Sequence, residues 1–195
     1  MDEKTIAAAK ADIEATSDLL ERALKLSGLL VSLFRERGFS LVVVGGSAVE
    51  FYTDGGYMSG DIDFCRKTLR AVPLRLMQEV AEQLGGKGLG RNWLICGLYV
   101  DILGLLEAET VLPERVVETP YGPVKVIPPE LALVERIFYA EQDKECETSA
   151  RQMMVAALKD ASFDWTEAER LADSRDFKVL PRLEALRKEL SDADA

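Results

Sequence analysis

The chain has 195 residues, of which 48% are apolar, and it carries a formal net charge of −10. It contains no histidine, which excludes Ser-His-Asp hydrolysis, His-Glu-x-x-His zinc sites and histidine-dependent ribonuclease chemistry within this chain. No apolar run approaches the ~20 residues of a membrane span, so we expect no membrane partner. The negative net charge disfavours a nucleic-acid partner without excluding one.

The cysteines and the first residues of the chain predict a cytoplasmic location. The three cysteines, Cys65, Cys96 and Cys146, are odd in number and form no Cys-x-x-Cys pair. The N-terminus lacks the pattern of a signal peptide, and free cysteines are typical of a reducing compartment. In the absence of histidine, carboxylates are the main candidates for acid–base chemistry.

The N-terminal segment, residues 2–37, is predicted to be helical with a break near residues 15–18. Its apolar residues recur at alternating four- and three-residue steps, which is the helical period, and Gly38 stands where a helix commonly ends. The apolar faces of these helices can pack on the rest of the chain or on a second copy, which leaves a homodimer open. The apolar stripe comprises Leu19, Ala23, Leu26, Leu30 and Leu33.

A glycine-rich turn follows the first predicted strand. The apolar, mostly β-branched run at 41–45 predicts this strand, and 47–54 predict a short helix. Gly45 and Gly46 would let the backbone approach a phosphate closely, and the helix N-terminus would present unpaired N–H groups. Ser47 adds a hydroxyl donor and is a candidate N-cap. Taken alone, Gly-Gly-Ser is more often an ordinary turn.

The second predicted strand, residues 61–65, carries two carboxylates. Asp61 and Asp63 are one residue apart, so their side chains point to the same face of a strand. Like charges held this close repel each other unless a cation or a proton lies between them. The alternative is a solvated edge of a loop.

A third acid lies in a predicted hairpin. Residues 72–84 predict a helix, and 91–96 and 98–105 predict two hairpin strands, which would place Asp101 beside Asp63. An isolated acid in this apolar stretch is costly to bury without a partner. Three converging carboxylates would form a site for Mg²⁺ or Mn²⁺, which prefer oxygen ligands.

The rest of the chain predicts one more hairpin and then only helices. The hairpin covers residues 115–127, and together these elements predict an α+β fold, with a small mixed β-sheet flanked by helices and a C-terminal helical bundle. We expect a core with the N-terminal helices over residues 1–129, and a helical region over 130–195 that closes one side of a cleft. The predicted C-terminal helices are 130–142, 145–160, 165–174 and 179–190.

The order Gly-Gly-Ser, Asp-Ile-Asp and a third Asp on a later apolar strand resembles the nucleotidyltransferase superfamily of DNA polymerase beta. The resemblance spans about residues 41–136. It is closer to bacterial stand-alone enzymes of the abortive-infection toxin type, and minimal nucleotidyltransferases of the antitoxin type come next. It implies two-metal transfer of a nucleoside monophosphate from a nucleoside triphosphate, ATP or another, to an acceptor. The implied residues are Gly45, Gly46 and Ser47 for the triphosphate, and Asp61, Asp63 and Asp101 for the metals and catalysis.

Two positions depart from the toxin-type pattern. Tyr57 stands where a basic residue is common, and Arg136 stands where a Lys is common; Arg136 keeps the charge, so we expect it to contact the nucleotide. These departures leave the nucleotide and the acceptor open: a small molecule, a protein side chain or an RNA end. A toxin–antitoxin or phage-defence role is one context. The alternative function is a catalytically silent nucleotide- or partner-binding module.

Overall fold

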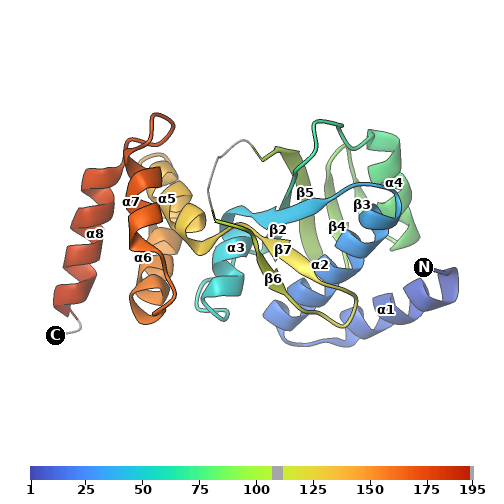
Figure 1. Ribbon diagram of the computed structural model, residues 1–195. Helices are drawn as coiled ribbons and strands as arrows, with labels where there is room; N and C mark the ends of the chain where they lie inside the picture. The colour runs from blue at the N-terminus through green and yellow to red at the C-terminus, as the bar shows by residue number, and fades with distance from the viewer. Residues whose placement is uncertain (107–111, 194–195) are drawn as a thin grey trace.

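The computed structural model describes residues 1–106 and 112–193 (Figure 1). Within these residues the strands form one mixed sheet of seven strands in the order β3-β4-β5-β2-β1-β7-β6. Helices flank this sheet, so the predicted α+β class with a mixed sheet is confirmed. The strands are β1 Leu41–Val44, β2 Asp61–Arg66, β3 Lys87–Leu89, β4 Asn92–Ile95, β5 Leu98–Leu105, β6 Arg115–Val117 and β7 Val124–Val126.

The helices fall into two groups (Figure 1). The first group, α1 to α4, packs beside the sheet, and the second, α5 to α8, gathers at one end of the molecule beside α3. No helix of the described residues has the length and apolar character needed to cross a membrane. The helices are α1 Glu3–Ala15, α2 Leu19–Glu36, α3 Gly45–Tyr52, α4 Leu74–Gln83, α5 Pro129–Tyr139, α6 Lys144–Lys159, α7 Trp165–Asp173 and α8 Leu180–Ala193.

Strands β2 and β5 bury one face in the core and leave the other face more exposed. On β2, Ile62 and Phe64 are fully buried in the core, whereas Asp61 and Asp63 lie on the opposite face. β5 repeats this alternation, with Val100 and Ile102 buried and Asp101 between them more exposed. The period-two pattern that predicted strands therefore also decides which side chains face the cleft.

The predicted hairpin of β4 and β5 is confirmed. Ile95 pairs with Leu98, which leaves Cys96 and Gly97 as a two-residue turn. Both turn residues have positive φ angles, 50° and 81°, as a type I′ turn requires. A turn of this kind also sets the register, so Asp101 lies opposite Asn92.

Some predicted boundaries were wrong. Helix α3 begins at Gly45 rather than at residue 47, because the positive φ of Gly45 turns the chain directly from strand into helix. Val44 therefore occupies the N-cap position, and the predicted Ser47 cap was wrong. The short edge strand β3 was missed, since its Lys-Gly-Leu sequence has no strand signal and its pairing with β4 defines it. The division at residue 129 stays a prediction.

Candidate active site

Strand pairing brings the three predicted aspartates to one face of the sheet. β2 and β5 run parallel, and Asp63 lies directly opposite Asp101. Neighbouring strands lie ~4.8 Å apart, and Asp61 is on the same face two residues before Asp63. Val44 pairs with Asp63 from the other side, so the glycine turn that follows β1 lies next to the same carboxylate.

The glycines of this turn lie against the site. Gly45 has a φ of +66°, and a Cβ atom on it would lie 2.8 Å from Asp63 Oδ2. A Cβ on Gly46 would lie 3.2 Å from the Ser59 hydroxyl oxygen, in the loop that leads into β2. The side chains of Asp63 and Ser59 thus occupy the space that a larger residue would need. The first turn of α3 also leaves backbone N–H groups without partners inside the helix.

The Ser47 hydroxyl bridges the two strands at this point. Its side chain is fully buried, donates to the Val44 carbonyl oxygen at 3.1 Å and accepts from the Asp63 backbone N–H at 2.9 Å. Here the hydroxyl positions the strand that carries Asp63. The predicted contact of Ser47 with a triphosphate would therefore use its backbone N–H.

Negative charge accumulates at Asp63. Burial, followed by the negative charges of Asp61 and Asp101, raises the pKa of Asp63 to about 6, and Arg136 acts in the opposite direction. Burial also raises the pKa of Asp101, and there the nearby Arg91 opposes it. A cation bound between these carboxylates would relieve the repulsion.

The donor set fits Mg²⁺ or Mn²⁺ in kind and in register, because hard cations prefer carboxylate oxygens. Two carboxylates are nevertheless turned toward protein partners. Asp61 accepts a hydrogen bond from the Ser59 hydroxyl. Asp101 lies 3.6 Å from Arg91 Nε, and the Asn92 amide, oriented with its nitrogen toward Asp101, donates to both oxygens at 3.0 Å. In these rotamers no three acidic or cysteine side chains of the described residues lie close enough to enclose an ion.

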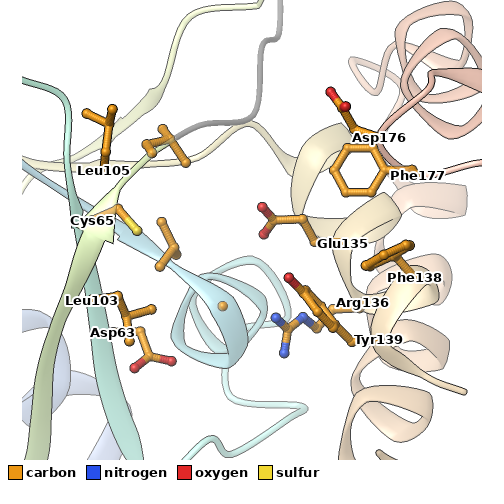
Figure 2. A pocket seen from close by; sticks show the side chains of 13 residues that line it. Asp63, Cys65, Leu103, Leu105, Glu135, Arg136, Phe138, Tyr139, Asp176 and Phe177 are labelled. Carbon is orange, nitrogen blue, oxygen red and sulfur yellow. The ribbon is translucent and has the colours of Figure 1, made fainter. Parts of the chain in front are cut away.

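A cleft of about 580 Å³ opens from Asp63 between the sheet and helix α5 (Figure 2). The sheet forms one wall, and α5 with the connection between α7 and α8 forms the other. The wall residues are Val44, Gly45, Asp63, Cys65, Leu103, Leu105 and Leu106 on one side, and Glu135, Arg136, Phe138, Tyr139, Asp176 and Phe177 on the other.

Arg136 lies in this cleft, on the wall opposite Asp63, and Figure 2 shows its guanidinium directed into the opening. Its Nη1 donates to Cys146 Sγ at 3.4 Å, and the guanidinium lies 5.8 Å from the centroid of the Tyr139 ring. Its Nε is buried and has no hydrogen-bond partner among the residues that the structure describes. A buried donor without a partner is costly, so Arg136 retains capacity for an anionic ligand.

The fold agrees with the comparison with solved structures. The chain is similar to an antigenic nucleotidyltransferase-like protein from Paracoccidioides brasiliensis, with a TM-score of 0.55 and 15% identity over 89% of this chain and 94% of that chain. The chain has a nucleotidyltransferase-like fold. At this identity the likeness concerns the fold alone, and the toxin-type resemblance stays a prediction.

Two further structures are similar at a lower level. One is the solution structure of the antibiotic-resistance factor ANT(2'')-Ia, with a TM-score of 0.47 and 19% identity over 86% of this chain and 97% of that chain. The other is a crystal structure of ANT(2'')-Ia with adenylyl-2''-tobramycin, with a TM-score of 0.49 and 18% identity over 86% of this chain and 98% of that chain. This likeness is too weak to bear on function. No protein-family profile and no curated protein matches the chain.

Two acidic residues near the site of this nucleotidyltransferase-like fold were missed in the sequence. Glu50 on α3 is 3% exposed, and its Oε2 accepts a hydrogen bond from the Ser59 N–H at 3.0 Å. Burial raises the pKa of Glu50. Its spacing of four residues from Gly46 was the available signal, because residues i and i+4 share one helix face. The other, Glu135, lines the cleft directly before Arg136.

Glu50 connects α3 to the loop that carries Ser59, so its truncation has a testable consequence. We expect Glu50→Ala to lower the free energy of unfolding by about 2 kcal/mol, because the partly buried Ser59 N–H loses its acceptor and a cavity remains. Urea unfolding measures the loss, and hydrogen exchange should show the Ser59 amide exchanging faster. Glu50→Gln is the control, since it keeps an acceptor oxygen. Unchanged exchange at Ser59 in Glu50→Ala would contradict this role.

Proposed function

We propose that the protein is a metal-dependent nucleotidyltransferase that moves a nucleoside monophosphate from a nucleoside triphosphate to an acceptor. One observation carries the proposal: Asp63 and Asp101 lie opposite each other on parallel strands, with Asp61 on the same face. Of the three carboxylates, Asp63 lines a cleft that is also lined by Gly45 of the glycine turn and by Arg136. The combination supports phosphoryl chemistry, which depends mainly on positioning and on neutralising charge.

The residues divide into two groups by chemistry. Asp61, Asp63 and Asp101 would hold Mg²⁺ or Mn²⁺, which activates an attacking oxygen and offsets the charge of departing pyrophosphate. Backbone N–H groups at the start of α3, together with Arg136, would hold the triphosphate, because a helix N-terminus and a guanidinium both favour anions.

The transfer step exchanges one bond to phosphorus for another. The hydroxyl oxygen of the acceptor forms a bond to the α-phosphorus, and the bond from this phosphorus to the bridging oxygen breaks. Pyrophosphate leaves with the electron pair of that bond. The acceptor's proton passes to a carboxylate, and we assign this role to Asp101, whose pKa is raised by burial.

Thermal melting with nucleotides tests the proposal. We expect at least one of ATP, GTP, CTP and UTP to raise the melting temperature in the presence of Mg²⁺, with about 2.7 kcal/mol of stabilisation at a hundredfold excess over Kd. Asp61→Ala should remove the Mg²⁺-dependent part. Asp173→Ala is the matched control, since it removes an exposed acid of α7 outside the cleft. No shift with any of the four nucleotides would contradict the proposal.

A silent nucleotide-binding module is the second candidate. It is favoured by the contacts of Asp101 with Arg91 and Asn92, which occupy a carboxylate needed for catalysis. This function predicts a melting shift that is the same with and without Mg²⁺, and no release of pyrophosphate.

The biological context extends the proposal further. The resemblance to abortive-infection enzymes supports a cytoplasmic role in toxin–antitoxin or phage defence. Expression in a bacterial host should then arrest growth, and Asp61→Ala should restore it. Harmless expression of the wild-type protein would count against this role.

A further inference from the structure

The end of the cleft beyond Arg136 has a different chemical character from the end at Asp63. Figure 2 shows the Glu135 carboxylate extending from α5 toward the sheet wall. It forms no hydrogen bond and no ion pair with any described residue, although the residue is partly buried. Removing a carboxylate from water without a partner is costly even where burial is partial, and a ligand that carries the missing counter-charge would recover this energy.

A second acid and apolar walls complete this end. Asp176 lies at the rim, in the connection between α7 and α8, and likewise has no hydrogen bond or ion pair among the described residues. Phe177 beside it and Leu105 across the cleft are apolar, and Figure 2 shows them on opposite sides of the opening. Arg136 is the one basic residue of the described lining, and its Nη1 is directed to Cys146.

We propose that the part of the cleft between Glu135 and Asp176 binds a cationic group of the acceptor, which makes the acceptor a small molecule that bears an amine. This inference rests on the transfer reaction proposed above. Two carboxylates on separate elements repel an anionic ligand, so a phosphate-rich RNA end does not fit this part of the cleft. An ammonium group contacts carboxylates through charge-assisted hydrogen bonds, and its carbon chain packs on the apolar walls.

The burial of the Glu135 side chain supports this assignment. It raises the pKa of Glu135 to about 7, with Arg136 acting against it. A bound cation would favour the ionised carboxylate. The competing occupant is a nucleobase, whose N–H groups can also donate to a carboxylate.

The test uses cadaverine, a five-carbon chain with an ammonium group at each end, and the neutral analogue 1,5-pentanediol as its control. Both are titrated into the full-length protein without nucleotide, at about 0.15 M salt so that long-range attraction to the acidic surface is screened. Amide chemical shifts report binding. We expect cadaverine to shift the amides of Cys65 and Phe177, and pentanediol to leave them unchanged.

Variants distinguish binding in the cleft from general electrostatic attraction to the acidic protein. Glu135→Gln should weaken cadaverine binding about tenfold, the loss of one charge-assisted hydrogen bond. Asp176→Asn, at an exposed position, should weaken it several-fold and serves if Glu135→Gln folds poorly. Asp173→Asn removes the same charge outside the cleft and should leave the affinity within twofold of wild type.

Three outcomes would overturn the inference. One is the absence of cadaverine binding, and another is an equal loss of affinity in Glu135→Gln and Asp173→Asn. The third is a change in which nucleotide raises the melting temperature of Glu135→Gln, because that places a nucleobase at this end. The proposed transferase fails separately: no nucleotide would shift melting, while cadaverine would still bind.

Discussion

Asp63→Asn is expected to abolish nucleotidyl transfer and at the same time to stabilise the metal-free protein. The amide has no negative charge to hold a cation, so the transfer rate should fall to about one-hundredth of wild type or less. The stabilisation arises because the half-buried Asp63 carboxylate faces the charges of Asp61 and Asp101. A loss of activity caused by unfolding would show the opposite change in melting temperature.

The stabilisation should depend on pH in a defined direction. The pKa of Asp63 rises from 3.8 to about 6 on folding, so the folded state binds this proton more tightly than the unfolded state. The free energy of unfolding therefore falls as pH rises through this interval, and the difference persists above it. The amide that replaces the carboxylate in Asp63→Asn cannot titrate, so this part of the decline should be absent from the variant.

Urea unfolding at about pH 4 and about pH 8 measures both effects. We expect Asp63→Asn to gain about 1–2 kcal/mol over wild type at the higher pH, after allowance for solvent screening of a half-buried group, and little at the lower pH. Asp173→Asn is the control, because this exposed acid lies outside the cleft. The same gain in both variants would mean that net charge, rather than the carboxylate cluster, is responsible.

Gly45→Ala is expected to inactivate the protein through the position of Asp63. A Cβ atom at residue 45 would lie 2.8 Å from Asp63 Oδ2, a separation that requires the carboxylate or the turn to shift. The φ of +66° adds strain of about 1 kcal/mol for any residue with a side chain. We expect a total loss of about 2–3 kcal/mol in stability and at least a tenfold loss in transfer rate.

Gly38→Ala provides a matched control. Gly38 follows α2 with a φ of +80°, and a Cβ on it would meet no heavy atom within 4 Å. This variant should therefore show the backbone strain without the clash, with about 1 kcal/mol lost and activity retained. If the two variants lose the same stability and the same activity, the contact of Gly45 with Asp63 does not matter for function.

Several features of the site could be predicted from local pattern. The period of two puts Asp61 and Asp63 on one face of β2, and it puts Asp101 on the corresponding face of β5. The turn at Cys96 and Gly97 set the register of the β4–β5 hairpin. These features depend on residues close together in the chain, so the sequence carries them directly.

Other features depend on contacts between distant segments. The Ser47 hydroxyl contacts the Asp63 N–H across 16 positions, and a local reading assigned it to a helix cap instead. Glu50 was missed because its partner Ser59 belongs to a loop whose path local pattern does not define. Asp101 was predicted to have metal partners. The structure adds Asn92, from the neighbouring strand β4, and Arg91, from the turn before that strand.

The sequence by itself determined the class of the fold, the order of most of its elements and the face on which each aspartate lies. Hydrophobic periodicity and turn chemistry are local properties, and they decide these points. The sequence predicted that the helical region closes one side of a cleft, but only the tertiary structure decided that α5 forms this wall and that Glu135 enters the cleft with no hydrogen bond or ion pair to a described residue. The position of α5 follows from packing among buried side chains of several elements, to which no single segment of sequence corresponds.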